Sequence, residues 1–291
     1  MAIVINGKAI AQSIRDDLTV KVTKLKEKGI TPTLAVILVG EDPASLSYIT
    51  GKEKALAQTG MESRERRLPA DSSEAQLLQL IAGFNTDPSI HGILVQLPLP
   101  AHINTERVIC AIDPAKDVDG FHPMSVGNAV LDRAGFIPCT PQGIVVLLQE
   151  SQIPIAGADL VIVGRSNLVG KPLANLLSRR SLNATVTLCH TGTRDLAAHT
   201  RRADILIAAI GKPRFITADM VRSGAVVVDV GVNRVPDIHA KNGYRLCGDV
   251  DYEPVGEKAS HITPVPGGVG PLTITMLLKN VIDAAAALAE T

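Results

Sequence analysis

Short runs of apolar residues alternate along this chain with segments whose apolar positions recur at helical spacing. Near the start, the runs Leu34–Val39 and Gly92–Gln96 are almost continuously apolar, which is typical of parallel strands covered on both faces. Helices are expected at about 8–28, 43–58 and 73–85. This alternation predicts an α/β protein with mainly parallel sheets.

A second series of the same kind begins after Pro123. An extended connector at 136–141 precedes a helix expected at about 142–150, and further strands are expected at Leu160–Val163, Ala184–Leu188, Ile205–Ala208, Ala225–Asp229 and Tyr244–Gly248. Strands spaced this closely, with helices between them, predict a complete doubly wound domain. An alanine-rich amphipathic helix at about Thr273–Ala289 closes the chain and is expected to pack on the first domain.

The length of 291 residues suits two hydrophobic cores better than one. We therefore predict the α/β class, with two α/β domains around a cleft, the second a Rossmann-like doubly wound parallel sheet. The first domain comprises residues 1–120 plus 273–291, and the second residues 140–265. Ligands bind at the carboxyl ends of strands in such sheets, so the strand ends at Gln96 and Gly164 are expected to open into the cleft.

Charge and composition narrow the range of partners. Lysine plus arginine and aspartate plus glutamate number 29 each, which leaves no basic footprint for nucleic acid. The start of the chain has no signal-peptide pattern, and no apolar run reaches the roughly 18 residues that span a bilayer. Four scattered cysteines lack the paired spacing of a zinc site, and no His-x-x-x-His pair occurs. We expect a cytoplasmic protein with free thiols, no metal and a small-molecule partner.

Tyr48 and Lys52 lie four residues apart in a predicted helix, which Asp42 and Pro43 begin and Gly60 ends. Residues at this spacing share one face of a helix, so the phenol and the ammonium project into the same space. Taken alone, the pair also fits a solvated surface lysine beside a half-buried tyrosine. The choice between these interpretations depends on motifs elsewhere in the chain.

The segment from Leu160 to Leu177 has the order strand, glycine turn, helix. Gly164 allows a tight turn after the strand, and Gly170 allows close helix packing, so that free N–H groups at the helix start can receive a phosphate. The segment departs from the dinucleotide fingerprint because Ser166 replaces the middle glycine and the last glycine comes late. An ordinary βα turn is the alternative interpretation.

The end of the following strand bears on the choice of cofactor. Domains that prefer NAD usually place a carboxylate there to hold the ribose 2′-OH. This chain has no carboxylate at that point, while Arg165 and Thr191 are available. A guanidinium without a competing negative charge favours a 2′-phosphate, and hence NADP over NAD. His190 either adds a third contact or is a surface histidine with no role.

Five separated motifs occur in order along the chain: Tyr48-x-x-x-Lys52, Gln96-Leu-Pro-Leu-Pro100, Lys116-Asp-Val-Asp-Gly120, Gly164-Arg-Ser-x-x-Val-Gly-x-Pro172 and Pro264-Val-Pro-Gly-Gly-Val-Gly-Pro-Leu-Thr273. With these motifs the chain closely resembles the bifunctional methylenetetrahydrofolate dehydrogenase/cyclohydrolases, from its first strand to its final helix. The resemblance implies oxidation of 5,10-methylenetetrahydrofolate with NADP, followed by hydrolysis of the methenyl product to 10-formyltetrahydrofolate. It also implies tetrahydrofolate derivatives as partners, a role in one-carbon metabolism and purine biosynthesis, and a homodimer.

The resemblance also implies roles for individual residues. Lys52 matches the family's catalytic lysine, and Gln96 matches the residue that hydrogen-bonds and positions it. Tyr48 matches the residue that orients the pterin, and Asp119 the carboxylate that pairs with the pterin's amino-pyrimidine edge. Substrate-binding positions are expected at Tyr48, Gln96, Asp119, Pro266, Gly267 and Gly268, and cofactor-binding positions at Gly164, Arg165, Ser166, Thr191 and Val232. Leu272 and Val232 depart from the usual family residues without removing a polar group.

Each of these residues also has a purely structural interpretation. Gln96 fits a cap at a sheet edge, Asp117 and Asp119 fit turn formers beside Gly120, and the glycine pair at 267–268 fits a tight loop. A short-chain dehydrogenase also uses a Tyr-x-x-x-Lys pair, but its pair follows the glycine-rich turn, whereas here the pair precedes it. A non-catalytic NADP-sensing module with a decayed site is a further rival, against which the presence of Lys52 argues.

Overall fold

The computed structural model describes residues 1–40, 43–240 and 243–288, and for residues 43–50 it describes the helical backbone without the side chains. Contacts divide the chain into two compact units, and each is described by itself. Unit 1 comprises Met1–Ala11 and Thr140–Thr273, and unit 2 comprises Gln12–Cys139 and Ile274–Thr291.

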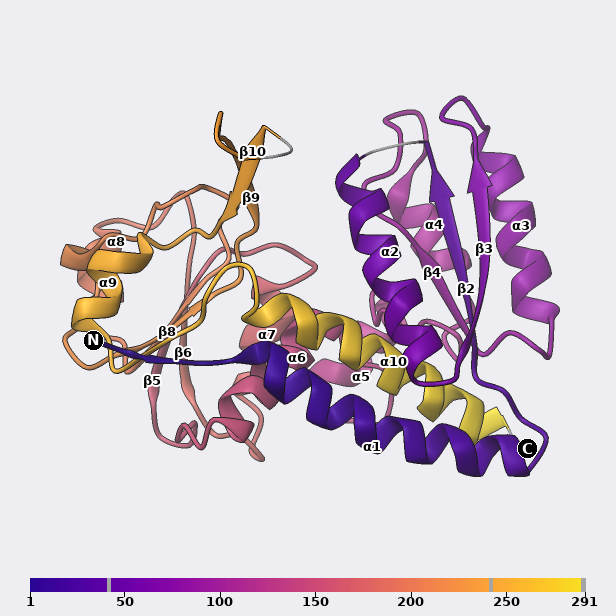
Figure 1. The fold of residues 1–291 in the computed structure, drawn as a ribbon, viewed down its shortest axis with the longest axis horizontal. Helices are drawn as coiled ribbons and strands as arrows, with labels where there is room; N and C mark the ends of the chain where they lie inside the picture. Colours follow the sequence, from indigo (N-terminus) through magenta and orange to yellow (C-terminus); the bar gives the residue numbers. More distant parts are fainter. Residues whose placement is uncertain (41–42, 241–242, 289–291) are drawn as a thin grey trace. The chain divides into compact units, whose positions relative to one another are not determined.

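Unit 2 contains a three-stranded parallel sheet in the order β3-β2-β4, formed by β2 (Thr33–Val39), β3 (Glu62–Leu68) and β4 (Gly92–Val95). Every residue of β2 and β4 is buried, as their continuous apolar sequences predict. The helices α2 (Pro43–Gln58) and α3 (Glu74–Thr86) flank these strands (Figure 1). The strands are parallel, so the carboxyl ends of β2 and β4 lie at the same edge of the sheet, which is where α/β sheets bind ligands.

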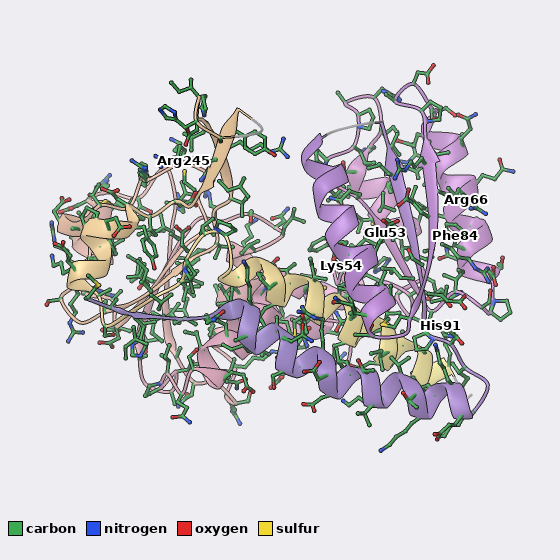
Figure 2. All side chains as sticks on the ribbon, in the orientation of Figure 1. Glu53, Lys54, Arg66, Phe84, His91 and Arg245 are labelled. Carbon is green, nitrogen blue, oxygen red and sulfur yellow. The ribbon has the colours of Figure 1, made fainter. Side chains whose placement is uncertain are left out.

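Local chemistry explains where α3 and β4 begin. A capping box joins Ser73 and Gln76, so the backbone N–H groups of these two residues are satisfied at the start of α3. His91, just before β4, is buried, and its Nδ1 accepts a hydrogen bond from the Thr33 N–H at 3.2 Å (Figure 2). Phe84 of α3 packs with Ile37 and Ile93 in the core of this unit.

The strand β3 was absent from the sequence-based prediction. Its sequence is charged at most positions, and all of its residues are exposed or half-buried. It lies at the edge of the sheet, where one side of the strand meets solvent, so a continuous apolar run is not required. The remaining helices that lie wholly within unit 2 are α4 (Thr105–Ala111) and α5 (Pro123–Val130).

Unit 1 contains a six-stranded parallel sheet in the order β1-β11-β8-β7-β5-β6. Its strands are β1 (Ile3–Val4), β5 (Asp159–Val163), β6 (Thr185–Cys189), β7 (Ile205–Ala208), β8 (Val226–Asp229) and β11 (His261–Ile262). Helices of this unit include α7 (Gly170–Leu177), α8 (Leu196–Thr200), α9 (Tyr252–Lys258) and a 3₁₀ turn, η1 (Ala218–Met220). The next two strands along the chain, β6 and β7, lie on opposite sides of β5. The strand order therefore reverses between β5 and β7, as in a doubly wound fold.

Two predictions for unit 1 were wrong. The strand expected at Tyr244–Gly248 is β10 (Tyr244–Cys247), but it pairs antiparallel with β9 (Asn233–Pro236) in a separate two-stranded sheet. The expected boundary also fails at the N-terminus, because β1 pairs with β11 and residues 1–11 group with unit 1. Both β1 and β11 are two residues long, too short to carry a periodic signal.

Two long helices begin close to their predicted positions. The helix α1 (Gly7–Glu27) and the last helix, α10 (Val269–Leu288), are joined by a 3.1 Å hydrogen bond from Arg15 to Thr275. From Ile274 onward, α10 groups with unit 2. By length and composition alone α10 could cross a bilayer, but more than half of that stretch is buried inside the structure, as in the core helix of a soluble protein. The helix α6 (Cys139–Glu150) begins three residues before the expected start at 142.

Candidate functional site

Lys52 and Gln96 meet inside unit 2. Lys52 lies on α2 with 5% of its surface exposed, and its Nζ donates to Gln96 Oε1 at 3.0 Å. Gln96 follows the end of β4, and its Nε2 donates to the Leu97 carbonyl at 2.8 Å. That second bond fixes the amide so that its oxygen faces the ammonium. The structure therefore contains the predicted lysine–glutamine contact, and the interpretation of Lys52 as a solvated surface residue was wrong.

Burial shapes the charge of this lysine. Desolvation lowers the pKa of Lys52, and the negative charge of Asp119 opposes that shift. A lysine with a lowered pKa releases its proton closer to neutral pH than an ordinary surface lysine does. This is the property that general acid–base chemistry requires of a lysine.

The loop 116–120 carries two carboxylates, Asp117 and Asp119, and the surroundings of each indicate a different role. Lys116 is buried and donates to the carbonyls of Phe84 and Asp87 at 2.9 and 2.8 Å, near the C-terminus of α3. Asp117 is 1% exposed and accepts hydrogen bonds that hold the start of α5, among them one of 2.6 Å from the Ser125 hydroxyl. The structural interpretation of Asp117 is therefore correct.

Asp119 does not take part in the hydrogen bonds that hold the start of α5. It is half-buried, and burial raises the pKa of its carboxyl, while the Lys52 ammonium and a hydrogen bond from the Cys139 thiol lower it. With Asp117 and Phe121 it lines a narrow cavity whose other walls are apolar residues of β4, α4 and their flanks. This cavity, at about 10 Å³, is no larger than a single water molecule, so a ligand would reach the Asp119 carboxylate from outside it. A carboxylate suits a ligand edge that presents paired N–H donors.

Gly120 is required by the conformation of this loop. Its φ is +74°, and a Cβ at this position would lie 2.7 Å from the backbone carbon of Ile137. The loop therefore passes the 137–139 segment without a side chain between them. This close approach brings Cys139 to Asp119.

Cys139 was not among the predicted site residues. It is 2% exposed, its Sγ donates to the Val118 carbonyl at 3.4 Å, and Nδ2 of Asn280 on α10 lies 3.7 Å from the sulfur. Burial and the nearby Asp119 charge raise the pKa of this thiol well above its usual range, so it stays protonated. The spacing of the cysteines could not predict that Cys139 lies beside Asp119, because this contact depends on loop 116–120 and residues 137–139 meeting in space.

Tyr48 lies within α2, but its side chain is outside the described residues. Its predicted proximity to Lys52 stays a prediction. Elsewhere in the described residues, no group of three or more His, Cys, Asp or Glu side chains could hold a metal ion. The expectation of no metal also stays a prediction.

In unit 1, the turn after β5 is built from backbone contacts. A Cβ on Gly164 would lie 2.0 Å from the Ala209 carbonyl oxygen, and one on Gly170 would lie 1.9 Å from the Gly164 oxygen. Only glycine fits at either position. Arg165 and Ser166 follow in an exposed stretch, and the Ser166 hydroxyl accepts a 3.1 Å hydrogen bond from the Val169 N–H. The turn is thus tight, exposed and directed into the start of α7, which is what a phosphate-binding turn requires.

Arg165 and Thr191 occupy equivalent places on neighbouring strands. Val163 ends β5 and Cys189 ends β6, and these two residues pair in register. Each candidate therefore comes two residues after an aligned strand end, and both are exposed. His190, directly before Thr191, uses its Nδ1 to accept a 3.0 Å hydrogen bond from the Gly192 N–H, so this nitrogen shapes the turn.

The last predicted segment of unit 1 is a glycine loop held close to the N-terminus of α1. The Gly267 carbonyl accepts a hydrogen bond from the Lys8 N–H at 3.1 Å, and the Gly268 N–H donates to the Pro264 carbonyl at 2.8 Å. A Cβ on Gly268 would lie 2.7 Å from Thr263 Cβ, and Gly267 has a φ of +114°. Pro266, which precedes the pair, follows Val265 through a cis peptide bond. Val232, in contrast, is 64% exposed between β8 and β9.

These features of unit 1 fit a dinucleotide. The cradle at Gly164 and Gly170 leaves no space for side chains, and an arginine without a neighbouring carboxylate stands beside it. Arg165, Ser166 and Thr191 are the residues that would hold the phosphates, and their roles stay a prediction. When bound, a nicotinamide dinucleotide supplies a hydride acceptor, which no side chain can supply.

Comparisons with known proteins agree with this division. Residues 5–119 match the family model described as tetrahydrofolate dehydrogenase/cyclohydrolase, catalytic domain, and residues 138–289 match the corresponding NAD(P)-binding domain. The chain is 58% identical over 286 residues to bifunctional protein FolD of Syntrophus aciditrophicus (strain SB), a match that covers 98% of this chain and 97% of that relative. It is 57% identical over 284 residues to the protein of the same name from Halalkalibacterium halodurans, covering 98% and 99%.

Solved structures give the same result. The bifunctional FolD methylenetetrahydrofolate dehydrogenase/cyclohydrolase of Campylobacter jejuni has a TM-score of 0.93 and 46% identity, and covers 99% of both chains. The Trypanosoma brucei methylenetetrahydrofolate dehydrogenase-cyclohydrolase, complexed with NADP cofactor and inhibitor, has a TM-score of 0.94 and 38% identity over 98% of both chains.

Proposed function

The chain belongs to the tetrahydrofolate dehydrogenase/cyclohydrolase family, and from that membership we propose the reactions that its residues carry out. The protein oxidises 5,10-methylenetetrahydrofolate to the 5,10-methenyl compound with NADP. It then hydrolyses that product to 10-formyltetrahydrofolate. The observation that carries this assignment is the buried Lys52–Gln96 contact beside Asp119.

Oxidation makes few chemical demands on the protein. The substrate loses a hydride from its bridging carbon to the nicotinamide, and the nitrogens of the folate stabilise the resulting cation. The residues of the chain hold the two reactants at the distance that transfer requires. Asp119 is placed to bind the amino-pyrimidine edge, while Pro266, Gly267 and Gly268 offer a backbone surface without bulky side chains.

Hydrolysis requires proton transfers that a side chain must perform. Water adds to the methenyl carbon and loses a proton. The resulting hydroxyl then loses its own proton as the formyl C=O forms and the bond from that carbon to N5 breaks, and N5 takes up a proton. Two protons leave the water and one returns to N5, so one proton is released overall. Lys52, with its lowered pKa, is suited to accept and return protons in these steps. Gln96 acts on Lys52 by holding its ammonium in one place, and so is a positioning residue.

An absorbance assay tests the assignment directly. The protein is mixed with 5,10-methylenetetrahydrofolate and NADP, and the reduced cofactor and the methenyl compound are followed at their separate absorbance bands. Reduced cofactor should accumulate while the methenyl band rises and then decays to 10-formyltetrahydrofolate. A protein that reduces no cofactor, or that leaves added methenyltetrahydrofolate unchanged beyond the buffer rate, would contradict the assignment of that half-reaction.

A further inference from the structure

Two buried carboxylates of unit 1 have taken no part in the chemistry above. Asp229 ends β8 and is 3% exposed, while Asp249 follows β10 and is fully buried. The Asp249 carboxylate accepts backbone N–H bonds from Ile210 at 2.6 Å, Gly211 at 2.9 Å and Lys212 at 3.0 Å. It therefore holds the loop that follows β7.

Asp229 holds a second loop in the same way. Its carboxylate accepts backbone N–H bonds from Gly231 at 3.0 Å, Asp249 at 2.9 Å and Val250 at 2.9 Å. The first of these bonds fixes the turn after β8, and the other two attach that turn to the segment containing Asp249. The two carboxylates thus join the loops after β7 and β8 into one network.

The backbone leaves room for both carboxylates at two glycines. A Cβ on Gly248 would lie 1.8 Å from Asp229 Oδ2, and a Cβ on Gly231 would lie 2.1 Å from Asp249 Oδ1. Any side chain at these positions would displace a carboxylate from its N–H donors. Nδ2 of Asn233 completes the arrangement with a 2.9 Å bond to Asp249 Oδ1.

The loops held in this way are those that border the candidate cofactor site. Ala209, directly before Ile210, is the residue whose carbonyl lies against Gly164, and its N–H donates to the Val163 carbonyl at 2.8 Å. Val232 directly follows Gly231. Both loops leave the carboxyl ends of parallel strands next to the point where the strand order reverses, which is where such sheets bind ligands.

We propose that Asp229 and Asp249 are positioning residues for NADP: they act through the backbone of loops 209–212 and 230–233 and hold both loops in the shape that receives the cofactor. This inference rests on the proposed function, because it takes NADP as the ligand of unit 1. Loops held before binding lose less conformational freedom when the cofactor arrives, so the network favours NADP affinity.

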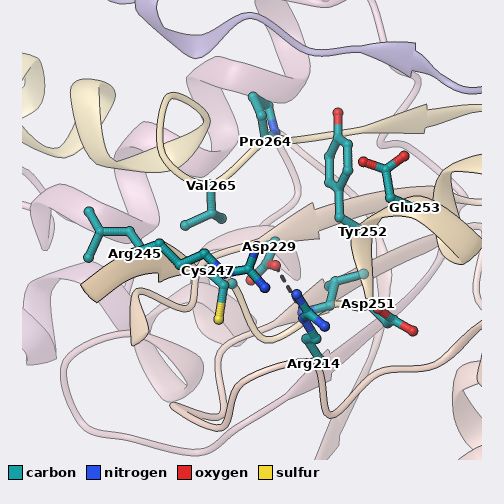
Figure 3. A pocket seen from close by; sticks show the side chains of 12 residues that line it. Arg214, Asp229, Arg245, Cys247, Asp251, Tyr252, Glu253, Pro264 and Val265 are labelled. Carbon is teal, nitrogen blue, oxygen red and sulfur yellow. Dashed lines mark hydrogen bonds between the residues drawn. The ribbon is translucent and has the colours of Figure 1, made fainter. Parts of the chain in front are cut away.

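The chain offers a matched control for a test. Asp251 lies two residues beyond Asp249 and lines the same surface cavity as Asp229 (Figure 3). It caps α9 without a side-chain hydrogen bond to the helix. Asp251→Asn therefore repeats the chemical change of Asp249→Asn without breaking the network. Val227 lies on β8 in the hydrophobic core of unit 1, so Val227→Ala should lower stability without touching the network and serves as the control for loss of stability alone.

The experiment compares Asp229→Asn, Asp249→Asn and both controls with the unaltered protein by two measurements. Hydrogen exchange without NADP reports the protection of the N–H groups of residues 210–212, 231, 249 and 250. Calorimetric titration with NADP gives the dissociation constant. An asparagine presents an NH2 group to backbone donors, so each network variant should lose protection at its own loop and bind NADP roughly tenfold to a hundredfold more weakly. Both controls should keep wild-type affinity.

Some results would overturn the proposal. If Asp229→Asn and Asp249→Asn lower the melting temperature like Val227→Ala but bind NADP as tightly as the unaltered protein, the carboxylates are only scaffold. If both fail to fold, Asn233→Ala removes one donor to Asp249 without adding a clash. It should weaken NADP binding several-fold, and unchanged affinity would refute the positioning role. Absence of NADP binding by the unaltered protein would instead refute the proposed function.

Discussion

At the scale of single residues, the two aspartates of the 116–120 motif show how burial and hydrogen bonding assign roles. The Asp117 carboxylate accepts hydrogen bonds at the start of α5, whereas the Asp119 carboxylate and the Lys52 ammonium shift each other's pKa. The sequence placed both beside a glycine and could not by itself separate a turn former from a ligand-binding group. The resemblance to the family indicated Asp119 as the ligand-binding residue. The structure agrees, because the Asp117 carboxylate is already occupied by hydrogen bonds at the start of α5.

The coupling of Asp119 to Lys52 predicts a shift in a pH profile. The Asp119 charge raises the pKa of Lys52, against the lowering by burial. Asp119→Asn removes that charge, so the pKa of Lys52 should fall further. The rising limb in kcat/KM for methenyl hydrolysis, which reports Lys52 losing its proton in the free enzyme, should move to lower pH. Measuring the profile for both proteins tests this, and a limb that stays in place or moves to higher pH would contradict the coupling.

Asp229 predicts a pH dependence of stability. Burial raises the pKa of its carboxyl from the usual 3.8 to about 6, with a further contribution from the Asp249 charge, against the hydrogen bonds that lower it. Between these values the folded protein binds more protons than the unfolded chain, so stability from this group is present at low pH and is lost as pH rises through 6. The shift corresponds to about 3 kcal/mol.

Urea denaturation of wild type and Asp229→Asn at several pH values between 4 and 7 measures this effect. The variant has no carboxyl to titrate at this position. The free energy of unfolding of the wild type should therefore fall relative to that of the variant as pH rises. A constant difference between the two proteins would mean that Asp229 does not titrate in this range, and a rising difference would mean that its pKa is lowered.

At the scale of helices and strands, the aligned ends of β5 and β6 predict cofactor choice. Arg165 and Thr191 follow these ends and no carboxylate stands between them. Arg165→Ala should raise the Michaelis constant for NADP by roughly tenfold to a hundredfold, because a charge-assisted contact is worth about 1.5–3 kcal/mol. Steady-state kinetics with each cofactor provides the measurement, and NAD use should stay nearly unchanged. An equal loss with both cofactors would show that Arg165 supports the fold of the turn instead.

Elements with strong periodicity were predictable from the sequence, and short or edge elements were not. The buried strand β2 and the helix α2 lie where their apolar patterns placed them. The charged edge strand β3 has no apolar pattern, because the buried face of an edge strand is small. The strand character of β10 was correct, but its pairing with β9 depends on a turn and a partner that the apolar pattern does not specify.

The candidate site followed the same rule. Contacts between residues of a recognisable motif were expected, and the Lys52–Gln96 bond is the example. Contacts that depend on distant segments meeting were missed, as with Cys139 beside Asp119, and with the Asp229–Asp249 network. In the second case the carboxylates bind backbone N–H groups, which are the same in every sequence and leave no pattern to find.

At the scale of the whole molecule, the two reactions make different demands on the chain. Lys52, the group assigned to proton transfer, lies in unit 2 together with Gln96 and Asp119. The turn assigned to the cofactor lies in unit 1. A change that removes only the proton-transferring group should therefore leave the binding of both ligands, and the dehydrogenase reaction, in place.

The most direct test of this account is the pair of activities of Lys52→Gln, measured on the same preparation. Proton transfer by a placed side chain contributes roughly 10²–10⁴-fold, so hydrolysis of methenyltetrahydrofolate should fall by that factor, while NADP reduction continues and the methenyl absorbance persists. Asp119→Ala is the comparison, because loss of common binding should weaken both reactions together. Equal loss of both activities in Lys52→Gln, with folate binding intact, would contradict the assignment of Lys52 to the hydrolytic step.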